Sequence, residues 1–433
     1  MRVAIIGGGY AGMAAAVTLA AQRIPVTVFE SAKHLGGRAR GVWHRDTQLD
    51  NGQHILLGCY HHTLDLIHQV GGNIERDFLR LPLQLTLHNR FQLKASRLPA
   101  PLHLLTGLLG ARGVTIGTRL KAVRFMLAMR RVLFTLPHDM TALELLRNHK
   151  QDELIRLLWE PICIAALNTP LHKASAQVLL NVLRDSLHGS RHASDMLLPR
   201  KDLSALFPDR AAEFLRRHGG SVQLACGVEA ILPQHNEIEL RSTQGVQRFS
   251  HVICAASPTA AARLLRDVPE LALVAAQIEA IPMQPIYTVY LQYPEHVRLP
   301  YAMLGFDQCY TQWLFDKGQI AGQKGLIAAV ISAEGIHQDL PHEQLAQSVA
   351  LELRQQLKIT AVPLWHQVIA EKRATFSCEV NLSRPLTATS ISNILLAGDY
   401  THGDYPATLE GAVMSGIRCA RKIVYAYNAA TVV

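Results

Sequence analysis

The first 30 residues restrict the fold of this chain more than any other stretch. Apolar residues over 3–6 lead into the turn Gly7-Gly8-Gly9-Tyr10-Ala11-Gly12, and an apolar segment over 13–21 follows. A second apolar run over 26–29 ends at Glu30. This order predicts a strand, a tight turn, a helix and a second strand, which together place a dinucleotide pyrophosphate at a helix N-terminus.

Three glycines and one acid in this unit have separate expected tasks. Gly7 allows the tight turn, Gly9 lets the backbone approach the phosphates, and Gly12 lets the helix pack closely on the strand. Glu30, 23 residues after Gly7, can accept hydrogen bonds from both ribose hydroxyls and disfavours a 2′-phosphate. The unit therefore favours FAD or NAD over NADP.

The composition limits the class of protein. With 433 residues, 49% of them apolar, the chain is long enough for two or three globular domains. We expect no signal peptide, because the glycines of the nucleotide motif interrupt the first apolar run. We expect no membrane-spanning helix, because no uncharged apolar stretch reaches about 18 residues. The seven cysteines are scattered without a C-x-x-C pair and the histidines are dispersed, so we expect reduced thiols, a cytoplasmic location and no metal site.

The positive charge of the chain is concentrated in one segment. The formal net charge is +9, yet residues 78–138 contain ten Lys or Arg and no Asp or Glu, and much of this segment is apolar. Basic and apolar residues together predict a helical segment, about 99–134, that lies on an anionic membrane surface. A solvated helix face and a lid over an apolar pocket are the alternatives, while the scarcity of aromatic residues argues against nucleic acid.

A second glycine-rich run follows the ribose-binding acid. It reads Leu35-Gly36-Gly37-Arg38-Ala39-Arg40. Gly36 and Gly37 allow a close approach to a pyrophosphate, and the Arg38 guanidinium offers a fork of donors to phosphate oxygens.

Together these motifs resemble the FAD-binding half of the flavin amine oxidase and phytoene desaturase superfamily. The resemblance implies an α/β fold, in which a discontinuous, glutathione-reductase-like Rossmann domain binds FAD and a mixed α+β domain binds the substrate. We expect the FAD-binding domain to comprise residues 1–75, 205–275 and 385–433, and the substrate domain to comprise residues 76–204 and 276–384.

The C-terminal part of the chain extends the resemblance. A buried strand over 393–398 ends in Asp399, whose carboxylate can bind the ribityl hydroxyls of a flavin. The segment 408–416 then opens a helix, whose N-terminus can stabilise negative charge on a reduced flavin. The resemblance also places residues 50–55 beside the flavin ring and the backbone of Val228 against the adenine.

The predicted FAD contacts come from both ends and the middle of the chain. They are Gly7, Gly9, Tyr10, Ala11, Gly12, Glu30, Gly36, Gly37, Arg38, Gly52, Gln53, His54, Val228, Gly398, Asp399, Leu409, Glu410, Gly411 and Ala412. We expect FAD to be bound non-covalently, because Cys378 lies in Thr-Phe-Ser-Cys-Glu and not in the Ser-Gly-Gly-Cys-Tyr setting of covalently flavinylated amine oxidases.

Three stretches resemble the hydroxysqualene dehydroxylases, a family within this superfamily. They are Asp50-Asn51-Gly52-Gln53-His54-Ile55, Glu371-Lys372-Arg373-Ala374-Thr375-Phe376 and residues 396–416. For that family the implied reaction is reductive removal of the hydroxyl of hydroxysqualene, which gives squalene for hopanoid biosynthesis, with FADH2 as hydride source and an unidentified electron donor. Such a polyprenoid substrate agrees with membrane contact through segment 78–138, so we expect a peripheral protein on the inner face of the cytoplasmic membrane.

Three other functions stay open. Carotenoid desaturation is the closest enzymatic alternative, because its substrate is also long and apolar. Amine oxidation is disfavoured by Thr408, which stands where amine oxidases have an aromatic residue, and by an acid-free approach that would repel a cation. Prenyl-binding escort proteins share this fold without using flavin.

The proton donor for loss of the hydroxyl has three candidates, His54, Asp50 and Tyr405. By resemblance, His54 and Asp50 lie near the flavin ring and could supply the proton directly or through water. Each also has a structural alternative, with Asp50 as a turn cap and His54 as an anchor of the backbone.

Overall fold

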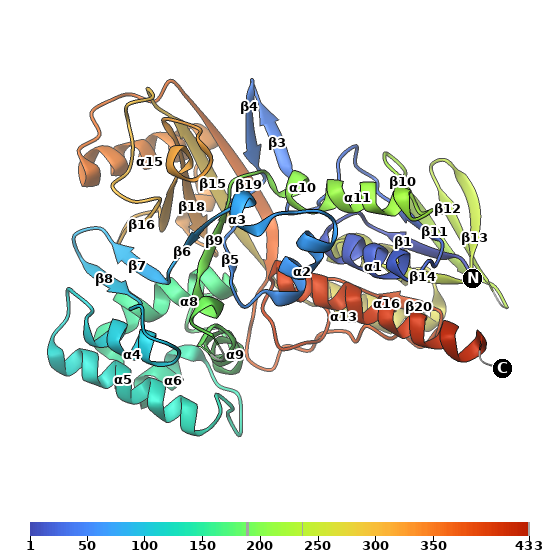
Figure 1. Ribbon diagram of the computed structural model, residues 1–433, viewed down its shortest axis with the longest axis horizontal. Coiled ribbons are helices and arrows are strands. Elements are labelled where there is room, and N and C mark those ends of the chain that lie inside the picture. The colour runs from blue at the N-terminus through green and yellow to red at the C-terminus, as the bar shows by residue number, and fades with distance from the viewer. Residues whose placement is uncertain (188–189, 236, 432–433) are drawn as a thin grey trace.

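Figure 1 shows the computed structural model of the chain, which describes residues 1–187, 190–235 and 237–431. Two lobes lie side by side. One contains a parallel sheet and both ends of the chain, and the other contains a large, mostly antiparallel sheet with a group of short helices.

The first lobe is built on a five-stranded sheet in which every neighbouring pair of strands is parallel. The four strands other than β10 are almost completely buried, as expected where both faces of a parallel sheet are covered. The strand order is β10 (Ser221–Gln223), β2 (Val26–Phe29), β1 (Val3–Ile6), β14 (His251–Cys254) and β20 (Ile394–Leu396). The sheet therefore joins the start, the middle and the end of the chain.

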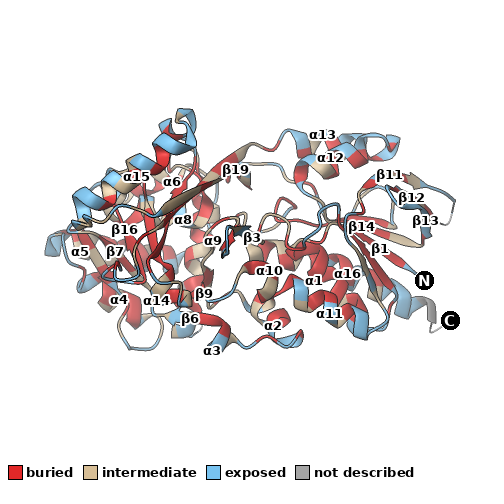
Figure 2. Ribbon diagram, turned by 90° about the horizontal axis from the view of Figure 1, so that it is seen from above, coloured by how far each residue is buried: buried red, intermediate tan, exposed pale blue. Residues whose placement is uncertain are grey.

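Helices cover one face of this sheet and a small antiparallel sheet covers the other (Figure 2). The helices are α1 (Tyr10–Ala21), α11 (Pro208–Arg217) and α16 (Leu409–Thr431). The opposite layer contains β11 (Val228–Pro233), β12 (Ile238–Ser242), β13 (Gly245–Phe249), α12 (Pro258–Arg266), the 3-10 turn Pro269–Leu271 and α13 (Ala272–Glu279).

Two glycines allow close backbone contacts around the start of α1. A Cβ atom on Gly416 would lie 2.1 Å from the carbonyl oxygen of Ala11, and one on Gly12 would lie 2.0 Å from that of Gly7. Side chains cannot approach backbone oxygens so closely, so Gly416 sets the distance between α16 and α1, and Gly12 sets that between α1 and the glycine turn. The C-terminal helix is thereby fixed beside the glycine turn that begins the chain.

The second lobe contains a seven-stranded sheet that is antiparallel apart from its β16–β7 pair. Its order is β19 (Trp365–Phe376), β15 (Met283–Gln292), β18 (Leu326–Ser332), β17 (Trp313–Asp316), β16 (Met303–Gly305), β7 (Gln84–Leu87) and β8 (Phe91–Lys94). This sheet therefore combines two strands that precede β10 in the sequence, β7 and β8, with five that follow β14.

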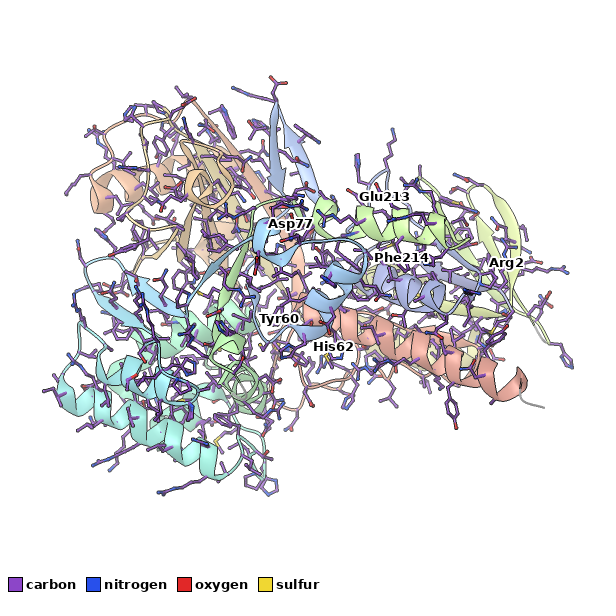
Figure 3. All side chains as sticks on the ribbon, in the orientation of Figure 1. Arg2, Tyr60, His62, Asp77, Glu213 and Phe214 are labelled. Atoms are coloured by element: carbon purple, nitrogen blue, oxygen red, sulfur yellow. The ribbon has the colours of Figure 1, made fainter. Side chains whose placement is uncertain are left out.

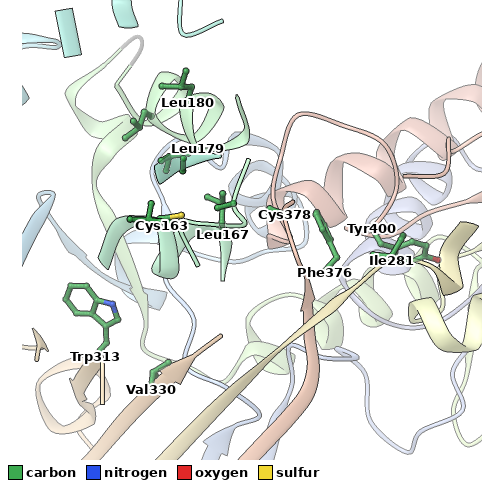
Figure 4. Packing of buried hydrophobic residues seen from close by; sticks show 14 of the residues in the cluster. Cys163, Leu167, Leu179, Leu180, Ile281, Trp313, Val330, Phe376, Cys378 and Tyr400 are labelled. Atoms are coloured by element: carbon green, nitrogen blue, oxygen red, sulfur yellow. The ribbon is translucent and has the colours of Figure 1, made fainter. Parts of the chain in front are cut away.

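Alternate side chains of this sheet pack into two separate cores, as the pleat of a strand requires. Tyr287 and Val289 of β15 pack with α15 (His342–Leu357), while Trp313 and Val330 pack with helices on the other face, as Figure 4 shows. Those helices are α4 (Leu102–Leu109), α5 (Ile116–Arg131), α6 (Ala142–Asn148), α7 (Asp152–Leu154), a π-helical turn (Ile155–Trp159), α8 (Glu160–Leu167) and α9 (Ala176–Leu187).

Short elements connect the two lobes. A three-stranded antiparallel sheet pairs β9 with both β5 and β6, so the chain segments that pass between the lobes are hydrogen-bonded to each other. The connecting elements are β3 (Gly41–His44), β4 (Thr47–Asp50), β5 (Leu56–Leu57), α2 (His61–Gln69), α3 (Ile74–Asp77), β6 (Phe78–Leu81), the 3-10 turn Arg191–Ser194, β9 (Met196–Pro199), α10 (Leu203–Leu206), α14 (Lys317–Ala321) and the 3-10 turn Ile336–Asp339.

The predicted fold class is confirmed, with a discontinuous Rossmann-like lobe and a mixed α+β lobe. The exact domain boundaries stay a prediction. The basic apolar segment predicted over 99–134 forms α4 and α5, and within the described residues no helix is both long enough and apolar enough to cross a membrane.

Candidate active site

A cavity of about 1070 Å³ extends from the glycine turn of the first lobe into the helices of the second. Binding pockets for drug-sized ligands enclose about 300–1,000 Å³, so this cavity is large. Of the predicted contact residues, Gly7, Gly9, Tyr10, Ala11, Glu30, Gly36, Gly37, Arg38, Gly52, Gln53, His54, Val228, Gly398, Asp399, Leu409 and Ala412 line it. The structure thus brings together residues that lie as far apart in the sequence as Gly7 and Ala412.

The start of α1 is suited to a pyrophosphate. Gly9 precedes the helix in extended conformation, and no side chain caps the first turn. The loop residue Gly36 pairs with Gly9, and a Cβ on Gly37 would come within 3.4 Å of the Gly9 Cα. Backbone N–H groups at an uncapped helix N-terminus attract anions, so the residues present fit the phosphates of a dinucleotide.

Glu30 closes the turn from the opposite side. Its Oε2 accepts a hydrogen bond from the Gly8 N–H at 2.7 Å, and its Oε1 accepts one from the Ala32 N–H at 2.8 Å. A carboxylate has about four acceptor sites, so Glu30 keeps capacity for ribose hydroxyls at the cavity wall. Its contact with a ribose stays a prediction.

Arg38 and Asp399 form an ion pair that links the two ends of the chain. The Arg38 guanidinium also donates to the carbonyl of Ala374 at 2.8 Å. Burial works to lower the pKa of Arg38, but the Asp399 carboxylate outweighs burial and raises it. The predicted phosphate donor and the predicted ribityl-binding acid therefore lie side by side on the cavity wall.

His54 lies on the cavity wall and is anchored to its own loop. Its Nδ1 is 2.8 Å from the carbonyl oxygen of Gly52, which requires the proton to be on Nδ1. Burial lowers the pKa of His54, and the Arg38 charge lowers it further, although the Gly52 carbonyl opposes both. A neutral ring is poorly suited to donating a proton, so the geometry favours the anchoring role.

Two acids predicted at the site do not line the cavity, because both cap helices. Asp50 is 4% exposed, and its Oδ1 accepts a hydrogen bond from the Leu203 N–H at 2.9 Å, at the start of α10. Glu410 is 1% exposed, and its two oxygens accept four hydrogen bonds from the backbone and side chains of His62 and Thr63 at the start of α2. Figure 3 shows His62 at this place.

Gly12 and Gly411 also lie outside the lining. The space at Gly12 is taken by the Gly7 carbonyl and the Ile5 side chain, which is the close packing predicted for it. The Gly411 N–H donates to the Thr408 hydroxyl at 3.1 Å in the first turn of α16. For these two glycines, as for Asp50 and Glu410, the structure shows a packing or capping role in place of the predicted direct contact at the site.

The second half of the cavity is mostly apolar. Segment 78–138 contributes one wall of it, which agrees with the alternative that this segment covers an apolar pocket. The lining residues from that segment are Leu83, Gln84, Leu85, Leu93, Ala100, Pro101, Leu104, Leu105, Leu108, Met126, Leu127, Arg130 and Phe134. Helices α8 and α9 and the inner face of the large sheet form the remaining walls.

A polar group lies where the two halves of the cavity meet. It comprises Cys59, Tyr60, Asp185 and Tyr405, which all line the cavity. Tyr405 was a candidate from the sequence, whereas Tyr60 and Asp185 were missed. Asp185 belongs to no motif and reaches the cavity only because α9 packs beside the loop that precedes α16.

Cys378 is buried and does not line the cavity. Burial raises the pKa of its thiol to about 12. Non-covalent attachment of the cofactor stays a prediction, and this position agrees with it. Among the residues that the structure describes, no group of three or more His, Cys, Asp or Glu is arranged to hold a metal ion.

The D50N variant should have a different dependence of stability on pH. Burial raises the pKa of Asp50 to about 6, although Lys317, whose Nζ is 4.0 Å from Oδ2, opposes the shift. The folded state therefore holds a proton that the unfolded state releases near pH 4, so this group lowers the free energy of unfolding as pH rises from about 4 to 6. In D50N that slope should be less negative by up to about 1.4 kcal/mol per pH unit.

Urea unfolding at pH 4, 5 and 6 measures these slopes. The control is D46N, which removes an exposed acid from the adjacent hairpin turn and should keep the wild-type slope. Equal slopes for D50N and wild type would contradict a raised pKa for Asp50.

The R38K variant should bind FAD at least about tenfold more weakly than wild type. Lysine keeps the positive charge but loses the planar fork, and hydrogen bonds to charged groups contribute about 1.5–3 kcal/mol each. Titration of flavin-stripped protein with FAD, followed by flavin fluorescence, gives the dissociation constant. R45K, on the exposed turn of the β3–β4 hairpin, is the matched control, and unchanged affinity in R38K would remove Arg38 from the cofactor site.

Comparison with known proteins agrees with this geometry. The model of the family described as flavin containing amine oxidoreductase matches residues 10–424. Hydroxysqualene dehydroxylase of Rhodopseudomonas palustris is 28% identical over 445 residues, covering 99% of each chain. Zeta-carotene desaturase of Arabidopsis thaliana is 23% identical, covering 96% of this chain and 84% of its own length.

A solved structure shares the fold. Cyclohexylamine oxidase from Brevibacterium oxydans has a TM-score of 0.71 to this chain at 18% identity, covering 99% of both chains. With a family match that spans nearly the whole length and a cavity that fits a dinucleotide, this chain belongs to the flavin-containing amine oxidoreductases and is an FAD-dependent enzyme.

Proposed function

We propose that this enzyme catalyses the reductive dehydroxylation of hydroxysqualene to squalene, a step of hopanoid biosynthesis. The observation that carries the proposal is one continuous cavity, which joins a dinucleotide site to the large, mostly apolar second half of the cavity, the apolar chamber. The near full-length similarity to a hydroxysqualene dehydroxylase supports it. When bound and reduced, FAD supplies a hydride, and an unidentified donor supplies its electrons.

The chain's own residues would hold and orient the cofactor. The N-terminus of α1, together with Gly36 and Gly37, would bind the pyrophosphate, and Asp399 would bind the ribityl hydroxyls. Leu409 and Ala412 lie on the cavity wall in the first turn of α16, whose positive end would stabilise negative charge on the flavin ring.

The apolar chamber would bind the hydrocarbon and exclude water. Its walls are aliphatic and aromatic side chains from α4, α5, α8, α9 and the large sheet. A dry chamber strengthens every electrostatic interaction within it and limits side reactions of a reactive allylic centre.

Of the three candidate proton donors, His54 and Tyr405 line the cavity and Asp50 does not. We infer that Tyr405 contacts the departing oxygen. Burial and the nearby Asp185 carboxylate raise the pKa of Tyr405, so its hydroxyl stays protonated and can donate a hydrogen bond.

The polar group at the junction of the two halves of the cavity supports this function over its alternatives. A carotene has no hydroxyl to bind there, whereas an allylic alcohol has one. For an amine oxidase, Thr408 takes the place of an aromatic residue at the end of the loop that precedes α16. A prenyl-binding escort protein would have no need for the cofactor cavity.

The reduced enzyme should convert hydroxysqualene to squalene in an anaerobic reaction and should leave phytoene unchanged. Mass spectrometry of extracted products measures both reactions. Conversion of phytoene to a more unsaturated product, without formation of squalene from hydroxysqualene, would replace this proposal by carotenoid desaturation. A protein that cannot be reconstituted with FAD would support the escort alternative.

We also propose that α4 and α5 bind the inner face of the cytoplasmic membrane. The exposed residues Ile116, Leu120, Arg124, Leu127 and Arg131 follow helical spacing and form one stripe along α5. An exposed stripe of aliphatic and basic residues is typical of helices that lie on anionic lipid. Exposed Leu102 and Leu109 of α4 and Leu133 after α5 add apolar surface beside it.

The double variant R124E/R131E should bind anionic vesicles at least about tenfold more weakly, because each basic residue near such a surface contributes about 1 kcal/mol. Sedimentation with vesicles of phosphatidylcholine and phosphatidylglycerol measures the binding. R216E/R217E makes the same charge change on exposed α11 of the other lobe and should bind like wild type. Equal loss in both variants would show a general charge effect and contradict a specific α4–α5 surface.

A further inference from the structure

The polar group at the junction of the two halves of the cavity contains a paired acid and phenol. Tyr405 precedes α16 and Asp185 is on α9, and both side chains line the cavity. The Asn181 amide, one helical turn before Asp185, donates to the carbonyl of Asp404 at 3.1 Å, so α9 is held against the residue that precedes Tyr405. Tyr60, labelled in Figure 3, and Cys59 line the cavity beside them. Neither lobe alone would bring these residues together.

Asp185 is unusual among the walls of the chamber. Of the described cavity-lining residues from 76–204, Arg130 and Asp185 are charged. Arg130 is exposed at the surface, whereas the Asp185 side chain is 22% exposed. A carboxylate facing an apolar chamber is costly unless it has hydrogen-bond partners, so its presence there calls for a function.

The known partners of Asp185 leave room for a ligand. Its Oδ1 is 2.8 Å from the Nε of Arg184, which fixes the carboxylate from the side of α9. Tyr405 lies on the loop that leads to Leu409 and lines the same cavity. Because an ionised carboxylate has about four acceptor sites, it can still accept a hydrogen bond from a molecule in the chamber.

An alcohol has one donor and two acceptor sites on a single oxygen, which matches one carboxylate and one phenol. We propose that Asp185 and Tyr405 together bind the hydroxyl of the substrate, with Asp185 accepting its O–H and Tyr405 donating to its oxygen. This inference rests on the proposed function and specifies which part of the substrate the enzyme recognises. Since Tyr405 lies four residues before Leu409, the hydroxyl-bearing carbon would be held at the cofactor end of the chamber.

This arrangement has a consequence for specificity. A hydrocarbon without the hydroxyl would leave the pair with no partner from the ligand, and sites built to bind a hydroxyl discriminate strongly against analogues that lack it. The same difference would favour release of squalene, because the product no longer carries the group that the pair binds.

The test is the preference of the FAD-loaded enzyme for hydroxysqualene over squalene. Trp159 and Trp313 line the chamber, so quenching of tryptophan fluorescence reports binding without turnover. Wild type should bind the alcohol more tightly than the hydrocarbon. D185N and Y405F should each lower the affinity for hydroxysqualene by about tenfold or more and leave the affinity for squalene nearly unchanged.

D404N is the matched control, because Asp404 is exposed, adjacent to Tyr405 and outside the cavity lining. It should keep the wild-type preference. Variants are compared at equal flavin content. D185N changes the acid and Y405F changes the phenol, so a result from either variant that retains FAD is sufficient for the test.

The inference would be overturned if the FAD-loaded variants prefer hydroxysqualene over squalene as strongly as wild type does. It would also be overturned if wild type binds both ligands equally. Failure of the proposed function gives a different result. In that case the reduced wild type forms no squalene from hydroxysqualene, even though a preference for the alcohol and its loss in D185N are measured.

Discussion

The close contact of backbones at Gly12 and Gly416 is the constraint on which the rest of the molecule depends. With no Cβ atoms between them, the glycine turn, the start of α1 and helix α16 lie against each other. The N-termini of both helices therefore reach the same cavity, one through Gly9 and the other through Leu409. Two positive helix ends in one cavity suit a cofactor that carries phosphates and accepts negative charge when reduced.

Two groups of buried or half-buried carboxylates in this protein differ in their partners. Glu410 accepts four hydrogen bonds at the start of α2 and has no capacity left for a ligand. Asp77 is fully buried, and although burial opposes its ionisation, the Asn73 backbone and the charges of Arg76, Lys201 and Arg210 keep its pKa low. Carboxylates of this group hold elements together.

The second group lies on the cavity wall with acceptor sites to spare. Glu30, Asp399 and Asp185 each have protein partners that fix their position without using all the acceptor sites of the carboxylate. Under the proposed assignments, Glu30 would bind a ribose, Asp399 the ribityl chain of the flavin and Asp185 the alcohol of the substrate. The absence of acids from segment 78–138 has a related reason, because its helices cover an apolar chamber with one face and present aliphatic and basic residues to the outside with the other.

The sequence by itself determined the cofactor half of the protein. Motifs such as the first glycine turn and Glu30 can be identified from the sequence, because their function depends on backbone geometry and on local spacing along the chain. The family, the Rossmann-like lobe and the cofactor followed from them. Resemblance predicted Asp50 as a candidate proton donor and Glu410 as a cofactor contact, but neither lines the cavity. Their helix-capping bonds join segments about 150 and 350 residues apart, and no local pattern encodes such partners.

Only the tertiary structure decided how the substrate half is built. The chamber takes its walls from α4, α5, α8, α9 and one face of the large sheet, and these meet only after the chain has crossed between the lobes several times. Asp185 shows most clearly what the sequence could not predict. An acid on an amphipathic helix is expected to face solvent, and only the packing of α9 against the loop before α16 places Asp185 at the cavity. Spacing along the chain specifies which groups a turn or helix presents, whereas packing between distant segments decides which of them share one cavity.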